Sequence, residues 1–265
     1  MSLDWRNVDR DPAAADRYLS VAAEAFSKVR SQAFDRLRLV AGSRVLDVGC
    51  GNGAEAERMA AMIPGGSVTA IDSSAELIAL AKARTHSLGL NLDFRAADAH
   101  ALPFAAGHFD AGRIERVLQH VDDPQLAVRE LVRVVRPGGL VCAIEPDWQS
   151  SIFAGGDIEV ERAITRYKTD AEIAHGTIGR DLPEVLHLAG CVDIVTDPAI
   201  LGSPDLAFAD AMIGLSRCLR GAVAKMWISP AAAKQWWNAA EGRASRGTFY
   251  AAGIVIISSG TVPEK

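Results

Sequence analysis

The sequence has few cysteines and no long apolar run, and both shortages limit what the protein can be. Its four cysteines are scattered, and none of their spacings suits a set of metal ligands, so we predict no metal site. No stretch approaches the roughly 20 apolar residues that a membrane-spanning helix needs. The N-terminal stretch MSLDWRNVDRD is charged and lacks the apolar core of a signal peptide. We therefore expect a cytoplasmic protein with no membrane span, whose cysteines are reduced core residues.

A surplus of basic charge is missing too. Lysine and arginine number 28 against 33 acidic residues, which gives a formal net charge of -5 and a pI near 5.7. Nucleic acid and anionic membranes do not attract such a chain, so we expect neither as the main partner. The sequence is instead 49% hydrophobic over 265 residues, enough for one ordinary α/β domain or for two small domains.

Strand-like and helix-like segments alternate through the first half of the chain. Strands are expected at 44–48, 67–72, 90–95, 109–115 and 140–145, and helices at 12–40, 54–63, 74–88 and 123–136. Ser73 or Ser74 suits the cap of the third helix, and the RPGG sequence at 136–139 ends the fourth, because proline cannot continue a helix. This alternation predicts an α/β fold with a doubly wound, mostly parallel sheet that binds its ligand at the carboxyl ends of the strands.

The alternation breaks after residue 147, where apolar helical sequence exceeds what the connections of a sheet need. A helix at 182–189 and a strand at 192–196 resume it, and a last strand at 249–258 closes the chain. We divide the chain into an N-terminal helical segment (1–40), a ligand-binding core (41–147, continued at 179–197), a helical insertion (148–178), a helical cap (198–247) and a last strand with tail (248–265). We expect the two insertions to cover the carboxyl edge of the sheet.

The glycine loop in VLDVGCGNG, residues 45–53, joins a strand to a helix and offers bare backbone to a ligand. Gly49, Gly51 and Gly53, followed by Ala54, satisfy a permissive dinucleotide pattern, which by itself is a weak signal. Asp47 changes the interpretation, because a carboxylate at the strand end repels a pyrophosphate and attracts an ammonium group.

Two further acids end neighbouring strands. Asp72 suits the two hydroxyls of a ribose, and Asp98 can accept from an adenine amino group. Hydroxyls, an amino group and a cationic centre without phosphate describe S-adenosylmethionine better than a nicotinamide dinucleotide.

Six motifs, taken in order and spacing, resemble those of class I S-adenosylmethionine-dependent methyltransferases. They are VLDVGCGNG, ID at 71–72, AADA at 96–99, FD at 109–110, HVDDP at 120–124 and RPGG at 136–139. The resemblance is strong over about residues 40–146 and is nearest to the small-molecule branch, which includes quinone methyltransferases and bacterial natural-product methyltransferases. It implies a Rossmann-like sheet of seven strands in the order 3-2-1-4-5-7-6 with the last strand antiparallel. It also implies an enzyme that uses S-adenosyl-L-methionine and a small-molecule methyl acceptor.

The resemblance also implies residue roles at the cofactor. Asp47 and Gly49 would lie against its methionine part, together with Gly51 and Gly53, and Asp72 would bind the ribose. Ser73 and Leu77 would flank the adenine, while Asp98 and Ala99 would hold its edge. Glu115 and Arg116 end the fourth strand on the same side, and Arg116 can reach either the cofactor carboxylate or the acceptor. The alternative for Asp47 and Asp72 is simple helix capping.

His120 is the candidate general base, since it follows the fourth strand where acceptor and methyl group should meet and an imidazole titrates near neutral pH. The alternative is a histidine that only orients its loop. Further acceptor-pocket candidates are Tyr18, Asp147, Trp148, His175 and Arg180, whereas the tryptophans at 227, 236 and 237 are expected in the core.

Three functions stay open from the sequence. The first is methyl transfer to O, C or N of a small, largely apolar molecule, with natural-product or quinone biosynthesis as the expected setting. The others are a nicotinamide-dependent oxidoreductase and a protein of this fold that binds S-adenosylmethionine without transferring methyl. We expect a monomer or a homodimer.

Overall fold

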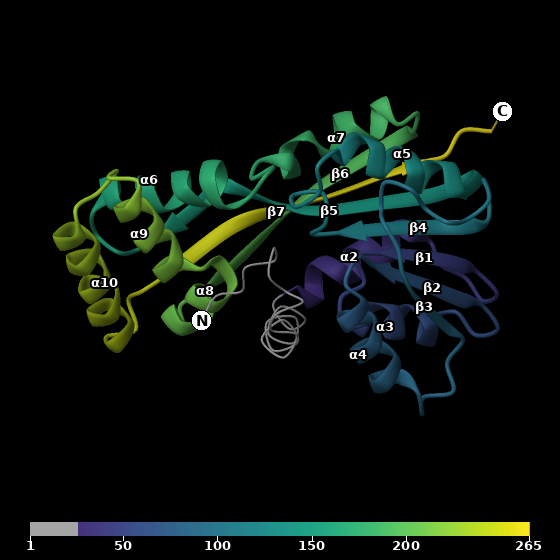
Figure 1. Ribbon diagram of the computed structural model, residues 1–265, viewed down its shortest axis with the longest axis horizontal. Coiled ribbons are helices and arrows are strands. Elements are labelled where there is room, and N and C mark those ends of the chain that lie inside the picture. Colours follow the sequence, from purple (N-terminus) through teal and green to yellow (C-terminus); the bar gives the residue numbers. More distant parts are fainter. Residues whose placement is uncertain (1–25, 265) are drawn as a thin grey trace.

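The computed structural model describes residues 26–264 of the chain and shows one sheet of seven strands with helices on both faces (Figure 1). The strands are β1 (Arg44–Val48), β2 (Ser67–Asp72), β3 (Leu92–Ala96), β4 (Phe109–Glu115), β5 (Val135–Phe153), β6 (Val192–Ser203) and β7 (Ala251–Thr261). Their order is β3-β2-β1-β4-β5-β7-β6, with β7 antiparallel to both of its neighbours and the other pairs parallel. The predicted fold and strand order are confirmed.

The helices divide between the faces of the sheet and one end of the molecule. They are α2 (Ser27–Leu37), α3 (Ala54–Met62), α4 (Ala75–Thr85), α5 (Pro124–Val134), α6 (Ile158–Tyr167), α7 (Ile178–Leu188), α8 (Leu206–Ile213), α9 (Leu215–Ala224) and α10 (Pro230–Ser245), with a π-helix, η2 (Lys168–Glu172), directly after α6. Buried side chains of α5 and α7 pack on one face, and those of α2, α3 and α4 pack on the other (Figure 1).

Two helix starts follow from local side-chain chemistry. The Ser74 hydroxyl accepts from the Leu77 N–H at 3.2 Å and begins α4, so Ser74 rather than Ser73 is the cap. The Asp123 carboxylate accepts from the Leu126 N–H at 2.8 Å, and Pro124 occupies the first turn, where its missing N–H costs nothing. Both starts set the direction in which the preceding strand-edge loops run.

The strands β5, β6 and β7 are longer than the sequence predicts. Residues 148–153 and 198–203, expected as parts of the insertions, are strand, and β7 begins and ends later than predicted. The reason is mutual pairing, because β7 lies between β5 and β6 and satisfies the backbone of both over the added length. The polar sequence WQSS gives no strand signal, so the extension of β5 is not predicted. The Ser150 hydroxyl accepts from the Ile254 N–H of β7 where the register of the two strands shifts.

The helix predicted at 123–136 is two residues too long at its end. Helix α5 ends at Val134, and residues 136–139 belong to the start of β5 rather than to the end of the helix. The pairing of β4 with β5 jumps from Phe109 opposite Val135 to Ala111 opposite Leu140, so the proline and glycines form an irregularity within the strand pair.

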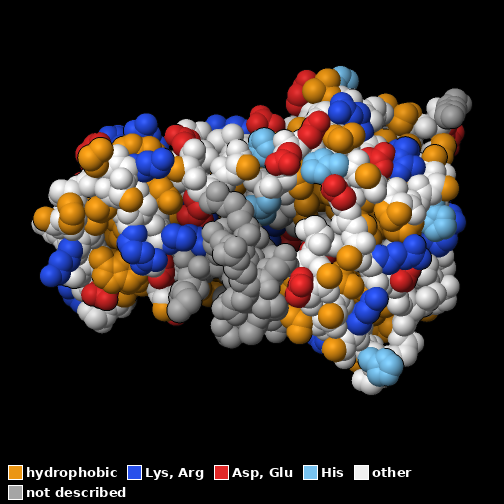
Figure 2. Space-filling view, viewed as in Figure 1, with side chains coloured by type: hydrophobic (Ala, Val, Ile, Leu, Met, Phe, Trp, Pro, Cys, Tyr) orange, Lys and Arg blue, Asp and Glu red, His pale blue; other side chains and the backbone are white. Residues whose placement is uncertain are grey.

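The helices α6, α8, α9 and α10 gather around the extended ends of β5 and β7, at one end of the molecule (Figure 1). They enclose a separate apolar cluster in which Trp236 is only 1% exposed, as predicted for a core residue. These helices, with η2, include both the predicted helical insertion and the predicted helical cap, and we call them together the cap. In the part of the chain that the structure describes, no helix is both long and apolar enough to cross a membrane. Figure 2 shows acidic and basic side chains interspersed on the viewed face.

Candidate functional site

The glycine loop leaves β1 at the carboxyl edge of the sheet. Gly49, Gly51 and Gly53 have φ angles of 75°, 55° and 78°, which favour glycine. A Cβ on Gly49 would stand 2.0 Å from Cγ2 of Val117, and one on Gly53 would stand 2.8 Å from the Phe94 ring. The protein's own packing therefore requires bare backbone at these two positions, a reason that the sequence does not reveal.

Asp72 ties this loop to the next helix. One of its carboxylate oxygens accepts from the Gly51 N–H at 2.9 Å, and the other accepts from the Ser74 N–H at 3.0 Å. Leu77 is buried on the helix that follows, whereas Ser73 is exposed.

The third predicted acid lies beyond β3 and faces solvent. The Asp98 carboxylate accepts from the His100 N–H at 2.9 Å and contacts the His100 ring nitrogen at 2.8 Å. The bond from the His100 backbone lowers the pKa of Asp98, so this group is ionised at neutral pH. Ala99 beside it is buried. The structure thus places Asp72 and Asp98 at the ends of neighbouring strands, as the sequence predicts.

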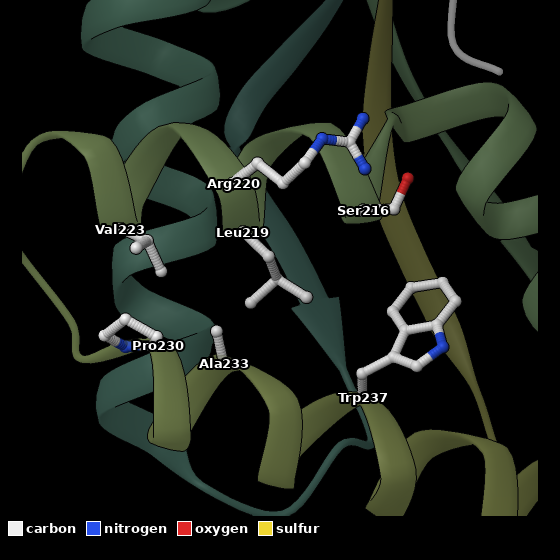
Figure 3. Close-up of a pocket in the computed structure, with 7 residues that line it drawn as sticks. All are labelled: Ser216, Leu219, Arg220, Val223, Pro230, Ala233 and Trp237. Atoms are coloured by element: carbon white, nitrogen blue, oxygen red, sulfur yellow. The ribbon is translucent and has the colours of Figure 1, made fainter.

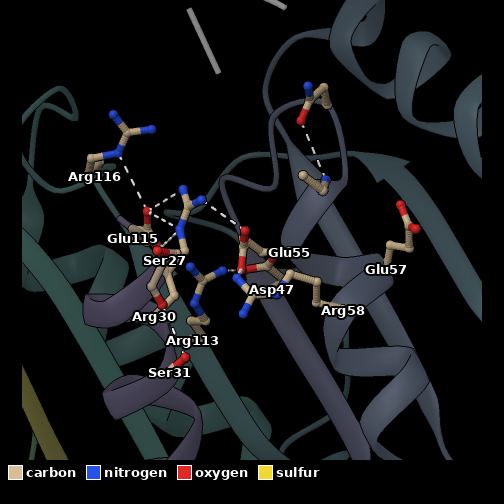
Figure 4. Close-up of polar contacts among 12 residues, drawn as sticks. Ser27, Arg30, Ser31, Asp47, Glu55, Glu57, Arg58, Arg113, Glu115 and Arg116 are labelled. Carbon is tan, nitrogen blue, oxygen red and sulfur yellow. Dashed lines mark hydrogen bonds and ion pairs between the residues drawn. The ribbon is translucent and has the colours of Figure 1, made fainter. Parts of the chain in front are cut away.

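Asp47 is part of a buried ion network that the sequence analysis missed (Figure 4). Its Oδ1 accepts from Nη1 of Arg113 at 2.8 Å, and Arg113 also contacts Glu115. Arg30 of α2 binds Glu115 at 2.7 Å and Glu55 of α3 at 2.8 Å. These five residues, each at most 7% exposed, are called the ion network below.

The ion network changes the interpretation of Asp47. Burial raises the pKa of this carboxyl, and the neighbouring Arg113 guanidinium opposes the rise. The cationic partner that the sequence analysis expected from a ligand is thus supplied by the protein itself. An arginine inside the predicted buried strand FDAGRIE, two residues before Glu115, is the signal that could have shown it.

Glu115 and Arg116 end β4 next to this network. Glu115 is occupied by Arg30 and Arg113, and Nε of Arg116 lies 3.5 Å from its carboxylate. The Arg116 backbone has φ 54°, and its guanidinium lies 4.8 Å from the centre of the Phe26 ring. Arg116 therefore marks the junction between the strand edge and the start of α2.

Three of the predicted acceptor-side residues meet at the turn after β4, residues 117–121. His120 is exposed on this turn. Trp148 donates its indole N–H to the Gln119 side chain at 2.7 Å, and His175 donates its backbone N–H to the Gln119 carbonyl at 3.1 Å. The His175 ring also contacts the Val121 carbonyl, at 3.0 Å.

The other predicted acceptor-side residues are Arg180, Asp147 and Tyr18. Arg180 forms a two-point ion pair with Asp147, whose second contact is 2.9 Å long, so these two residues bind each other beside the turn. Tyr18 lies outside the described residues. Sequence analysis also missed Glu145, a fully buried carboxyl at the end of the parallel part of β5, which accepts from the Leu118 N–H at 2.6 Å.

Two cavities adjoin the cap. One, of about 70 Å³, lies between α8 and the extended sheet and is bounded at the strand edge by Phe26, Pro146 and Trp148. We call it the edge pocket; its walls are almost wholly apolar. The other, of about 540 Å³, is lined only by residues of α9 and α10, Trp237 among them (Figure 3). The second is larger, but none of its lining residues comes from the strand edge.

Comparison with known proteins agrees with this geometry. A family model described as a methyltransferase domain matches residues 46–143. An uncharacterized transposon protein of Streptomyces fradiae is 38% identical over 212 residues, 80% of this chain and 60% of that protein. A ubiquinone biosynthesis O-methyltransferase of Xanthomonas axonopodis pv. citri is 41% identical over 100 residues, 37% of this chain and 41% of that enzyme.

The chain thus spans 60% or less of the length of these curated relatives. Among solved structures, the cyclase SpnF is 25% identical, with a TM-score of 0.55 over 89% of this chain and 81% of the cyclase. The matched domain contains the glycine loop, Asp72, Asp98 and the whole of β4, and the sheet has the expected order. Residues 46–143 of the chain therefore match a methyltransferase domain, and the sheet has the seven-stranded order of the class I S-adenosylmethionine-dependent methyltransferase fold.

Proposed function

We propose that this chain transfers a methyl group from S-adenosylmethionine to an O, C or N atom of a small, largely apolar acceptor. The observation that carries the proposal is that the edge pocket is lined by Pro146, Asp147 and Trp148, which follow the parallel part of β5 on the edge that carries the cofactor motifs. Ligands of doubly wound sheets bind at this edge. The similarity to a ubiquinone O-methyltransferase supports an aromatic or quinol-like acceptor from quinone or natural-product biosynthesis.

The residues present fit the cofactor. Asp72 offers carboxylate oxygens for ribose hydroxyls, and the buried Leu77 and Ala99 offer apolar surface to an adenine ring. The Gly51 N–H is already donated to Asp72, so it is not offered to a phosphate, which disfavours the nicotinamide alternative. When bound, S-adenosylmethionine supplies an electrophilic methyl group on its sulfonium.

The chain's own residues then have three tasks: to hold the acceptor in line, to exclude water, and to remove a proton from a phenol or carbon acid. The apolar walls of the edge pocket perform the first two. His120 is the residue proposed for the third, because the 117–121 turn carries it at the end of β4. The pocket is well below the roughly 300 Å³ of a typical ligand site. We therefore expect α8 to move away from the sheet when an acceptor enters.

A second candidate function is supported by one comparison. The resemblance to SpnF extends over most of both chains, and SpnF is a cyclase rather than a methyltransferase by name. A chain of this kind can keep the cofactor site and use the edge pocket for an isomerisation.

Product mass separates the two. The protein is incubated with methyl-deuterated S-adenosylmethionine and an apolar metabolite extract, and the products are measured by mass spectrometry. Our proposal predicts a deuterated methyl product and an equal amount of S-adenosylhomocysteine, both reduced at limiting cofactor concentration in Asp72→Ala. A product of unchanged mass without S-adenosylhomocysteine would instead establish the second function.

A further inference from the structure

The turn that carries His120 is held at its base by a buried carboxyl. Glu145 is 0% exposed, and its Oε1 accepts from the Leu118 N–H at 2.6 Å. Within residues 26–264 its Oε2 has no hydrogen-bond partner. Burying a carboxyl oxygen without a hydrogen bond costs free energy of folding, which suggests that Glu145 has a role at this position.

The same turn is packed against the glycine loop. Gly49 and Val117 approach so closely that a Cβ on Gly49 would overlap the valine side chain. On the outer side, Trp148 and His175 bind Gln119 by side chain and by backbone. The position of the turn therefore affects the cofactor loop on one side and the edge pocket on the other.

We propose that Glu145 is a positioning residue, which holds the 117–121 turn closed against the glycine loop through its bond to the Leu118 N–H. The residue touches neither of the predicted ligands and acts through the turn. This inference concerns the chain's own geometry, so it can be tested whether or not the acceptor is identified.

The charges around Glu145 indicate that the closed position of the turn depends on whether Glu145 is protonated. Burial raises the pKa of Glu145 to about 8. The backbone N–H groups of the turn, that of Leu118 first, and the Arg116 guanidinium oppose the rise. Asp147, next on the same face of β5, is paired with Arg180. The Glu145 backbone adjoins Gly179 of α7 and pairs with Ile256 of β7, and neither of these residues carries a charge. When the turn opens, water reaches the carboxyl and its pKa falls toward the ordinary value. Because Glu145 then binds its proton more tightly in the closed turn than in the open one, protonation of Glu145 stabilises the closed turn.

The experiment is hydrogen exchange of the Leu118 and Gln119 amides between pH 6 and pH 9, corrected for the intrinsic pH dependence of exchange. In the wild type, we expect protection of these amides to fall by up to about tenfold per pH unit as the pH rises toward about 8, the pKa of Glu145 in the closed turn, and to level off above it. Glu145→Gln keeps a carbonyl acceptor and cannot ionise, so its protection should not change with pH. Glu145→Leu has no acceptor and should lose about tenfold or more at every pH.

The effect of the turn on the glycine loop is measured in the same samples, as the affinity for S-adenosylhomocysteine in calorimetric titrations. The Kd should rise about fivefold or more in Glu145→Leu and stay within about twofold in Glu145→Gln. Glu130→Gln is the matched control, since Glu130 also accepts a backbone N–H, from Leu102, and is not in the turn. It should match the wild type. If wild-type protection is independent of pH, or if Glu145→Leu keeps both protection and affinity, the positioning role is wrong. Should Glu145→Leu not fold, the comparison of wild type with Glu145→Gln decides alone.

Discussion

The ion network beneath the glycine loop shows how far apart in sequence the deciding residues lie. Arg30 and its partner Glu115 are separated by 85 residues, and Asp47 and Arg113 by 66. Sequence analysis found both carboxylates, because they stand in recognisable strand-end motifs. It missed both arginines, since nothing local in α2 or β4 indicates which acid each one binds.

Removing one cation from this network should cost stability in a pH-dependent way. Arg113→Met leaves the fully buried Asp47 without a partner, and we expect unfolding free energy at pH 7 to fall by about 3–5 kcal/mol. The loss should shrink toward pH 5, because the unpaired Asp47 then takes up a proton more readily. Denaturant unfolding at both pH values measures it.

The double variant Asp47→Asn with Arg113→Met provides the control. It removes both charges of the pair, so it should recover a large part of the stability lost in the single variant. A double variant that is less stable than Arg113→Met would contradict the pairing.

At His120 we expect a catalytic effect rather than a structural one. With the acceptor found by isotope labelling, His120→Ala should lower kcat by about 10²–10⁴-fold while the Kd of S-adenosylmethionine holds. The rate of the wild type should also fall as the histidine becomes protonated at acidic pH. A folded variant whose kcat drops less than about tenfold would exclude the role of general base.

At the scale of elements, the sequence predicted the order of strands and helices but not the reach of the last three strands. Short segments between loop signals mark β1, β2 and β4, and most residues of β1 and β4 are buried. In the added lengths of β5 and β6, the sequences WQSSIF and PAILGS lack this signal. They are strand because β7 pairs with both, a partnership that forms only in the folded chain.

The contact of α9 with α6 in the cap can be tested through a single glycine. A Cβ on Gly221 would stand 2.0 Å from the Tyr167 ring, so Gly221→Ala must push this ring out of its place. We expect a loss of about 1–3 kcal/mol in unfolding free energy.

Gly242→Ala is the matched substitution in α10. Its Cβ would meet only the Arg246 side chain, at 3.4 Å, so the better helix propensity of alanine should stabilise the protein by about 0.5–1 kcal/mol. Thermal unfolding of both variants gives the comparison. Equal effects of the two substitutions would mean that α9 and α6 are not packed as described.

For the whole molecule, Glu145 implies a definite dependence of stability on pH. Its pKa is about 8 in the folded protein, against an ordinary value of 4.5. A raised pKa means that the folded state keeps a proton that the unfolded state has lost, so this contribution is complete below pH 4.5 and is lost as the pH rises to about 8. Wild type should therefore lose stability relative to Glu145→Gln over this interval, by about 1 kcal/mol per pH unit. A constant difference in denaturant midpoints would contradict the raised pKa.

The proposed function requires the cofactor to lie at the strand edge with Asp72 on its ribose. The most direct test is calorimetric titration of S-adenosylmethionine into the wild type, Asp72→Ala and Asp93→Ala. Asp93 is the control, an exposed carboxylate whose ion pair is with Arg95. Since two bonds from hydroxyls to a charged acceptor are lost, Asp72→Ala should weaken binding at least about tenfold. Asp93→Ala should bind as the wild type does. Because Asp72 also anchors Gly51 and Ser74, unfolding of each variant is measured alongside. A folded Asp72→Ala with wild-type affinity would contradict the cofactor site.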